Sequence, residues 1–251
     1  MIESAEPPAV EFSHVTKSFG ARRVLDDVSF RIPAGQSACI LGRSGTGKSV
    51  TLKHVVGLMA PDSGTVVVEG RHISQLSARE LSQARQRIGF LFQNAALFDS
   101  IRVGDNVEFP MRRHTDLSDS EIRSRARRLL AQVGLERDYD KMPADLSGGM
   151  RKRAGLARAL ALEPAILLAD EPSAGLDPIT AAEIDELFVK LRDHVRTTLL
   201  VVTHNIPSAR TIGESLIFLH EGRVIAQGTP DALAASEIPI VRRFMASEGG
   251  G

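Results

Sequence analysis

The sequence has little cysteine, no excess of charge and no long hydrophobic run. Its one cysteine, Cys39, lies in an apolar segment, where we expect a small buried side chain, and a single cysteine permits no internal disulfide. This usage fits a reducing compartment. Lys and Arg total 31, as do Asp and Glu, and the resulting net charge of zero argues against a general nucleic-acid-binding protein.

The sequence also lacks the patterns of a secretory signal peptide and of a membrane-spanning helix. Residues 1–8 are acidic and have no apolar centre, so they do not match a secretory signal peptide. No apolar run approaches the ~20 residues of a membrane-spanning helix. We therefore expect a cytosolic chain that needs a partner for any role at a membrane. Internal repeats and low-complexity segments are absent as well.

The sequence does contain alternating strand and helix patterns, over 251 residues that can bury a substantial core. Short, continuous apolar runs predict buried strands of a parallel sheet at residues 38–41, 88–92, 165–169 and 199–202. Residues 10–32 and 65–68 favour short antiparallel strands instead. These patterns predict an α/β fold with a β-rich start.

Helix starts are marked by two capping-box patterns, Ser77 with Glu80 and Ser118 with Glu121. Between about residues 95 and 162 the composition is helical, and Thr229 with Pro230 predicts one short terminal helix. We expect one domain over residues 9–246 that contains this helical subdomain, with flexible ends at residues 1–8 and 247–251.

Residues 42–49, Gly-Arg-Ser-Gly-Thr-Gly-Lys-Ser, match the pattern of a phosphate-binding loop between a strand and a helix. The glycines allow backbone N–H groups to turn inward at a helix N-terminus and form an anion site. Lys48 would reach the terminal phosphates, and the Ser49 hydroxyl would take one Mg²⁺ position. The structural alternative is a glycine-rich turn without a ligand. The candidate nucleotide contacts in this loop are Gly42, Arg43, Ser44, Gly45, Thr46, Gly47, Lys48, Ser49 and Val50.

An acidic pair, Asp170 and Glu171, follows a buried strand at the end where parallel sheets place their ligands. A phosphate loop needs a second anchor for Mg²⁺ and a group that orients the attacking water. Asp170 can hold the metal through water, and Glu171 can act as the general base. Alone, such a pair could equally cap a helix, but its combination with the loop favours catalysis.

Further motifs resemble those of the ATP-binding cassette (ABC) ATPases. Residues 146–150, Leu-Ser-Gly-Gly-Met, are similar to the signature sequence of that family and lie between the phosphate loop and the acidic pair. Gln93 falls where the Q-loop of the family lies, residues 173–177 resemble its D-loop, and His204 resembles its switch histidine. Phe19 matches the aromatic residue that stacks on adenine. Six motifs in this order make the resemblance specific.

The resemblance implies a P-loop NTPase fold, with a RecA-like parallel-sheet core, an N-terminal antiparallel β subdomain and a helical signature subdomain. It also implies ATP hydrolysis with Mg²⁺, in which His204 contacts the γ-phosphate and Gln93 contacts the metal or the water. The candidate metal ligands are then Ser49, Gln93 and Asp170. Taken singly, His204, Gln93 and Phe19 also fit structural roles, and only their alignment with the other motifs favours binding.

In the family, two cassettes pair head to tail, and the signature of each completes the nucleotide site of the other. Ser147, Gly148 and Gly149 would offer a hydroxyl, backbone N–H groups and a positive helix end to a phosphate. Asp177 of the D-loop is a further candidate contact. Met150 stands where the family usually has glutamine, so polar contacts of that glutamine are lost while the phosphate contacts remain.

Residues 45–50, 92–100, 176–180 and the Met150 signature together resemble the ATPases of Mla/Mce-type lipid transporters. That resemblance implies a homodimer, an integral membrane permease that docks near residues 95–105, periplasmic lipid-binding and small regulatory subunits, and no nucleic acid. It places the chain at the cytoplasmic face of the inner membrane, held there by the permease.

Three other functions remain open. The ATPase of a small-solute importer would share all of this chemistry. A soluble ABC ATPase that acts on DNA or ribosomes usually carries two cassettes, a coiled-coil insertion or zinc cysteines, and this sequence shows one cassette and one cysteine. A regulatory nucleotide-binding protein without turnover would need neither Glu171 nor His204.

Overall fold

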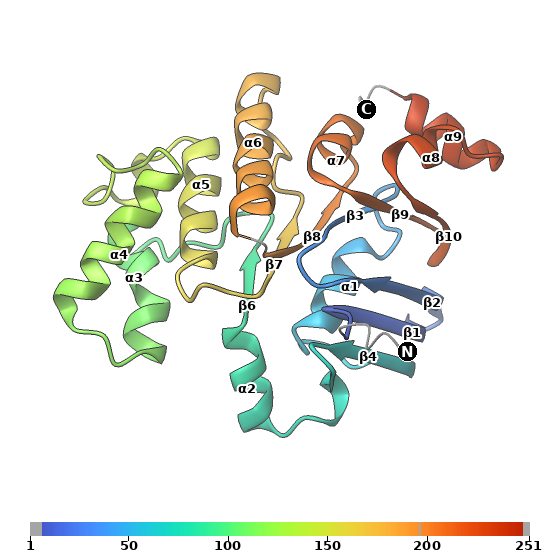
Figure 1. Ribbon diagram of the computed structural model, residues 1–251, viewed down its shortest axis with the longest axis horizontal. Coiled ribbons are helices and arrows are strands. Elements are labelled where there is room, and N and C mark those ends of the chain that lie inside the picture. The colour runs from blue at the N-terminus through green and yellow to red at the C-terminus, as the bar shows by residue number, and fades with distance from the viewer. Residues whose placement is uncertain (1–6, 196, 248–251) are drawn as a thin grey trace, which may run out of the picture.

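The computed structural model describes residues 7–195 and 197–247. The flexible ends predicted for residues 1–8 and 247–251 therefore lie mostly outside the described residues. Within the described part, strands form two sheets and helices cover them (Figure 1).

The strands confirm the predicted division between an antiparallel start and a parallel core. The smaller sheet is antiparallel and has the order β2-β1-β4-β5. The larger sheet has the order β10-β9-β3-β8-β7-β6, in which β9 through β6 run parallel and β10 pairs antiparallel with β9. The strands are β1 Val10–Phe19, β2 Arg22–Ile32, β3 Ser37–Leu41, β4 Ser63–Val68, β5 Arg71–His72, β6 Ile88–Leu91, β7 Ile166–Asp170, β8 Thr198–Thr203, β9 Ser215–His220 and β10 Arg223–Gly228.

The helices begin and end largely where capping chemistry predicts. Both predicted capping boxes form, with Ser77 at the start of α2 and Ser118 at the start of α4. The helices are α1 Lys48–Val55, α2 Ala78–Gln86, α3 Val103–His114, α4 Asp119–Gln132, α5 Gly148–Ala159, α6 Pro178–Val195, α7 Ile206–Ile212, α8 Pro230–Ala234 and α9 Pro239–Ala246. Short 3-10 turns occupy Ile73–Gln75 and Pro143–Asp145.

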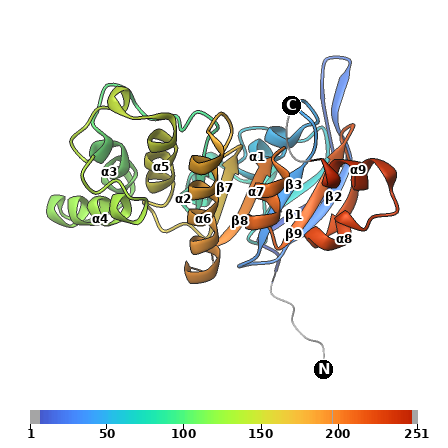
Figure 2. The same cartoon turned by 90° about the horizontal axis from the view of Figure 1, so that it is seen from above.

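The core has two parts, one on each face of the larger sheet. Alternate residues of β3 point to opposite faces, so Ala38 and Ile40 pack with α1 and the smaller sheet, whereas Cys39 and Leu41 pack with α3 through α9. Burial on both faces explains the continuous apolar runs that marked these strands. Seen from two directions, α3, α4 and α5 form one end of the molecule, and α8 and α9 form the other (Figures 1 and 2).

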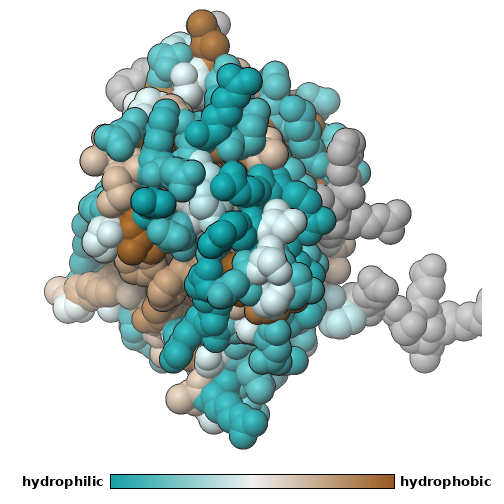
Figure 3. Space-filling view, turned by 90° about the vertical axis from the view of Figure 1, so that its left-hand side faces the viewer, coloured by the Kyte–Doolittle hydropathy of each residue, from teal (hydrophilic) through white to brown (hydrophobic). Residues whose placement is uncertain are grey.

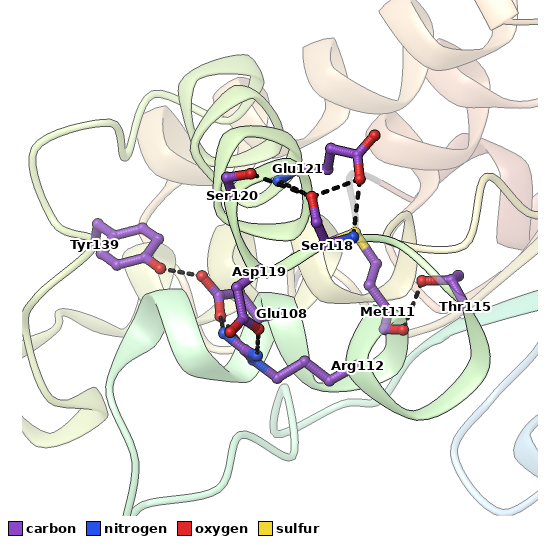
Figure 4. A network of polar contacts seen from close by, with 9 residues as sticks. All are labelled: Glu108, Met111, Arg112, Thr115, Ser118, Asp119, Ser120, Glu121 and Tyr139. Atoms are coloured by element: carbon purple, nitrogen blue, oxygen red, sulfur yellow. Dashed lines mark hydrogen bonds and ion pairs between the residues drawn. The ribbon is translucent and has the colours of Figure 1, made fainter.

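A polar network connects α3 to the segment 139–141, which precedes α5 (Figure 4). The buried carboxylate of Glu108 accepts hydrogen bonds from the Tyr139 hydroxyl and from Arg112, whose Nε lies 2.9 Å from Glu108 Oε2. Burial, followed by this contact with Glu108, raises the pKa of Tyr139 to about 12. Backbone bonds from Val103 to Lys141 and from Gly104 to Tyr139 add to the attachment.

Two features differ from the sequence prediction. The strands between residues 10 and 32 are long, because β2 continues through Asp26 and Asp27. Asp27 adopts φ 57°, and Asp26 binds Arg23 and Arg223 while its N–H donates to Gly222, so the polar pair is satisfied inside an irregular strand. The sequence also predicted one short helix after residue 229, whereas a second, α9, follows α8.

Candidate functional site

The candidate site lies where β3, β7 and β8 end, the edge at which parallel sheets bind ligands. A cavity of about 1110 Å³ opens there. The phosphate loop, Gln93, Glu171, His204 and Phe19 all contribute to its lining, although they are far apart in sequence. The sheet thus brings together side chains from most of the predicted motifs.

The phosphate loop runs from the end of β3 into α1 and depends on glycine at its tight turns. Gly47 has φ 104°, and a Cβ atom there would lie 2.8 Å from both Leu25 Cδ2 and the main-chain oxygen of Val24. At Gly42 a Cβ atom would lie 2.3 Å from the main-chain oxygen of Leu219. The loop can therefore pack against β2 and β9 only with glycine at these two positions.

Lys48 is buried inside this loop. Its ammonium donates to the main-chain oxygens of Gly42 at 2.9 Å and Arg43 at 3.2 Å, and lies 3.7 Å from Glu171 Oε1. Burial lowers the pKa of Lys48, while the charge of Glu171 acts in the opposite direction. A buried cation between the loop and a carboxylate is well placed to attract an anionic group.

Ser49 and Asp170 form a second contact between the loop and β7. The Ser49 hydroxyl donates to Asp170 Oδ1 at 2.9 Å. Burial is the main cause that raises the pKa of Asp170, and the Ser49 hydroxyl opposes it. Hydroxyl and carboxylate oxygens suit Mg²⁺, which keeps several waters and takes few protein ligands. Among the described residues, no cluster of three or more His, Cys, Asp or Glu could hold a metal alone.

Glu171 and His204 meet across the ends of β7 and β8. Glu171 Oε1 lies 2.9 Å from His204 Nδ1, and the His204 N–H donates to Glu171 Oε2 at 3.3 Å. Glu171 adopts φ 50°, a left-handed conformation that is uncommon outside glycine, and its N–H donates to Val202. Such conformations concentrate at functional sites, where the surrounding structure enforces them.

A further cation, Lys152, was missed by the sequence interpretation. Its ammonium, on α5, is buried and donates to the main-chain oxygen of Glu171 at 2.9 Å. Burial lowers the pKa of Lys152, and the charges of Glu171 and Asp170 oppose the change. A sequence signal existed, because Lys152 shares the spacing of Gly149 and Leu156 and so falls on the buried face of its helix.

Gln93 and Phe19 lie at different parts of the same cavity. The exposed Gln93 side chain follows β6 and shares the cavity with Lys48 and Glu171. Phe19 ends β1 and is 48% exposed, which argues against the alternative that it is a core residue. Arg22, which donates to the main-chain oxygen of Gly45 at 3.2 Å, and Phe244 of α9 are among the lining residues that were not anticipated.

The signature residues lie elsewhere. None of the described residues that line the cavity comes from 147–149 or is Asp177. Ser147 caps α5, because its hydroxyl accepts the Met150 N–H at 3.2 Å. Asp177 caps α6 by accepting N–H bonds at 3.0 to 3.1 Å, and the Thr180 hydroxyl is the main group that lowers its pKa. The signature residues and Asp177 thus lie outside the cavity that the phosphate loop lines.

Comparison with known proteins reveals extensive similarity. Residues 25–174 match the family model described as ABC transporter. The "Probable ribonucleotide transport ATP-binding protein mkl" of Mycobacterium tuberculosis (strain ATCC 25618 / H37Rv) is 45% identical over 94% of this chain, which spans 66% of the length of that relative. The "Intermembrane phospholipid transport system ATP-binding protein MlaF" of Escherichia coli (strain K12) is 37% identical over 97% of this chain and 91% of its own length.

Solved structures of ATP-binding cassettes are also similar to this chain. One is a dimer of the ATP-binding cassette MJ0796 in a post-hydrolysis state bound to ADP and Pi. It has a TM-score of 0.81 and 36% identity, and the match covers 88% of this chain and 98% of that one. Another is cbiO1 from Clostridium perfringens, part of the ABC transporter complex cbiONQ, with a TM-score of 0.84, 31% identity and coverage of 95% and 94%.

Proposed function

Since the chain belongs to the ABC transporter family, we propose that it binds ATP with Mg²⁺ and hydrolyses it to ADP and phosphate, to power a membrane permease. The observation that carries this proposal is the convergence of Lys48, Ser49 and the Glu171–His204 pair on one cavity. Asp170 adjoins this cavity through its hydrogen bond with Ser49.

The phosphates of ATP bind the loop at residues 42–49. Inward N–H groups and the positive end of α1 hold the anionic oxygens, and Lys48 exchanges its loop carbonyls for phosphate oxygens. Ser49 and Asp170 would hold Mg²⁺, Asp170 through water, and Gln93 would contact the metal or the attacking water. When bound, the metal would neutralise charge on the phosphates.

Glu171 accepts a proton from the attacking water as the water oxygen bonds to the γ-phosphorus. The bond between the γ-phosphorus and the β–γ bridging oxygen breaks, and ADP leaves with the electron pair on that oxygen. Its contact with His204 fixes the direction of the carboxylate, and Lys152 fixes the backbone from which that carboxylate extends. His204 also contacts the γ-phosphate. Phe19 stacks on the adenine ring at the far part of the cavity.

Two copies of the chain pair head to tail. The position of Ser147, Gly148 and Gly149 outside their own cavity supports this arrangement, since a second chain can bring them to the phosphates. The dimeric state of the MJ0796 cassette also supports it. Asp177 then lies beside the same interface.

The permease docks over the segment 95–105 and neighbouring aromatic side chains. Phe92, Phe98 and Phe109 are exposed, and the rings of Phe98 and Phe109 lie 5.0 Å apart. They line a cavity of about 370 Å³. A view of the end that carries α3 and α4 shows a hydrophobic area toward one side of a largely hydrophilic surface (Figure 3). Exposed aromatic clusters of this kind favour a protein partner.

The cargo proposed is phospholipid or another hydrophobic molecule of the bacterial envelope, because a relative named for intermembrane phospholipid transport aligns along nearly its whole length. Periplasmic lipid-binding and small regulatory subunits complete the assembly. In the described residues, no helix has the length and hydrophobicity to cross a bilayer. We infer from the transport-system name of this relative that a permease holds the chain at the cytoplasmic face of the inner membrane.

A tagged pull-down from detergent-solubilised membranes, with mass spectrometry of proteins and lipids, tests this proposal. A multispanning permease that arrives with a lipid-binding component and phospholipid supports it. A permease with a small-molecule-binding protein moves the cargo to a small solute, such as the ribonucleotide in the name of the mycobacterial relative. Recovery only with ribosomes or DNA overturns the transporter assignment.

A further inference from the structure

Arg158, near the end of α5, bonds to two consecutive main-chain oxygens in the segment that follows Gln93. Its Nη1 donates to the oxygen of Ala96 at 2.7 Å, and its Nη2 donates to the oxygen of Ala95 at 2.8 Å. The guanidinium also lies 5.9 Å from the centre of the Phe98 ring. The planar fork of one arginine thus sets the directions of two neighbouring carbonyl groups.

The two alanines adopt a backbone conformation that alanine disfavours. Ala95 has φ 58° and Ala96 has φ 49°, in the left-handed region where a Cβ atom crowds the following carbonyl oxygen. Successive carbonyls alternate in direction along an extended strand but point the same way along a helical turn. One guanidinium can therefore reach both oxygens in the helical form. Arg158 thus stabilises the left-handed pair against the extended alternative.

A turn places Gln93 immediately before this pair. The Ala95 N–H donates to the main-chain oxygen of Phe92 at 2.8 Å, so the central residues of the turn are Gln93 and Asn94. Ala95 is buried, whereas Gln93 is exposed and lines the nucleotide cavity. The position of Gln93 in the cavity therefore depends on the conformation at Ala95.

Two further contacts hold the segment on either side of the alanines. α5 approaches Ala95 at Gly155, three residues before Arg158, where a Cβ atom would lie 3.0 Å from the Cβ of Ala95. Beyond the alanines, the buried amide of Asn106 accepts the Phe98 N–H at 2.8 Å and donates to the Phe98 oxygen at 3.1 Å. The main chain of Phe98 is thus held without Arg158, which confines the effect of Arg158 to the residues before it.

We propose that Arg158 is a positioning residue that, through the left-handed pair at positions 95 and 96, fixes Gln93 in the nucleotide cavity. The proposal rests on the proposed ATPase function, in which Gln93 contacts the metal or the attacking water. Without the guanidinium, the alanines relax toward ordinary negative φ values, and the turn that carries Gln93 changes direction. Lys48 still binds the phosphates, because the described lining of the nucleotide cavity does not include Arg158.

The first test compares Arg158→Met, which removes the donors but keeps an apolar side chain, with Arg128→Met at an exposed position of α4. ATPase kcat, ATP affinity without Mg²⁺ and hydrogen–deuterium exchange are measured for each. We expect Arg158→Met to lower kcat about tenfold, with ATP affinity within about twofold of the unaltered chain. Exchange should rise in residues 93–97, while Asn106 keeps the Phe98 N–H protected. Arg128→Met should change none of these quantities.

Substitutions of Ala96 separate the backbone conformation from the charge of the arginine. Glycine adopts positive φ without a steric penalty, so Ala96→Gly in the Arg158→Met chain should restore kcat to within about threefold of the unaltered chain. Valine is β-branched and resists φ 49°, so Ala96→Val should lower kcat about tenfold although Arg158 is present. Ala235→Val, at an exposed residue with φ −89°, is its control. Thermal unfolding identifies any variant that fails to fold, and Ala96→Val tests the proposal if Arg158→Met is such a variant.

Normal kcat in folded Arg158→Met would overturn the proposal, as would a double variant without recovery. A loss of ATP affinity as large as the loss of kcat would also overturn it, since Arg158 would then support the whole site rather than Gln93. Failure of the proposed function is distinguishable, because the unaltered chain itself would not hydrolyse ATP. The exchange of residues 93–97 would still report the effect of Arg158 on the segment.

Discussion

The ammonium of Lys152 donates a hydrogen bond to the main-chain oxygen of Glu171 at 2.9 Å. Lys152 belongs to α5, whose first residues follow Ser147. The helix that we propose to serve the partner's nucleotide is thus attached to the glutamate of its own site. A shift of α5 on binding the partner's ATP would therefore be transmitted to the backbone of Glu171.

Replacement of Lys152 by Met is expected to lower kcat about tenfold and leave ATP affinity nearly unchanged. Methionine fills similar volume but cannot hold the Glu171 oxygen, and the left-handed backbone of Glu171 loses one of its restraints. Steady-state ATPase assays and nucleotide-binding titrations provide the measurements. Lys190→Met, an exposed change on α6, is the control. Equal losses of kcat and affinity would show that Lys152 supports the whole site rather than Glu171.

Glu171→Gln is expected to lower turnover at least about a hundredfold, since the amide cannot accept the proton of the attacking water. Lys48 and Ser49 remain, so ATP should still bind and the head-to-tail dimer should accumulate with ATP and Mg²⁺. Size-exclusion chromatography detects that dimer. The exposed Glu237→Gln change should behave like the unaltered chain. Near-normal turnover in Glu171→Gln would remove Glu171 from the role of base.

Much of this site follows from short sequence patterns. The glycine spacing predicts the loop, and Glu171 and His204 come together because each follows a parallel strand and these strands end at one edge of the sheet. The capping boxes at Ser77 and Ser118 are equally local. For these features the sequence contains nearly all the determinants.

Contacts that depend on the packing of one element against another could not be predicted. The buried side of α5 can be inferred from its sequence, but the partner of Lys152 depends on how α5 lies against the loop after β7. The helical spacing of α6 includes Ile184 and Phe188, and nothing in that pattern indicates that Asp185 is buried as well. The approach of α9 to the nucleotide cavity likewise follows from its contact with Phe218, a residue of β9.

Ser147→Arg is expected to leave ATP binding by the isolated chain intact and to block turnover, because the bulky cation closes the surface offered to the partner's phosphate. The Ser147 cap is also lost, at about 1 kcal/mol. Ser147→Ala loses the same cap without the bulk, so its thermal unfolding measures the structural cost separately. Arginine at the exposed Ser124 of α4 is the surface control.

Mixing two inactive variants tests the head-to-tail arrangement more directly. Ser147→Arg and Lys48→Ala chains should each be inactive alone, whereas a mixture should recover part of the turnover. Each mixed dimer has one site with an intact loop from the first chain and an intact signature from the second. Normal hydrolysis by Ser147→Arg alone, or no recovery on mixing, would contradict the head-to-tail arrangement.

The ionisation of Asp185 gives a prediction for stability rather than catalysis. Burial raises the pKa of this carboxyl from 3.8 to about 6, so the folded chain binds its proton more tightly than the unfolded chain does. The stabilisation by the proton is therefore complete below pH 3.8 and is lost as pH rises through about 6. At pH 7.5 the folded chain holds a buried charge, at a cost of up to about 3 kcal/mol.

Asp185→Asn removes that charge while it preserves shape. Relative to the unaltered chain, the variant should be more stable at about pH 7.5, and its advantage should shrink as pH falls to about 5, because the native carboxyl then takes up its proton. Urea unfolding at the two pH values measures the difference, and Glu186→Gln, an exposed neighbour, should show no such change. An advantage that is equal at both pH values would assign the effect to packing, since a difference in packing does not titrate. An advantage that follows pH would assign the destabilisation to the buried charge of Asp185.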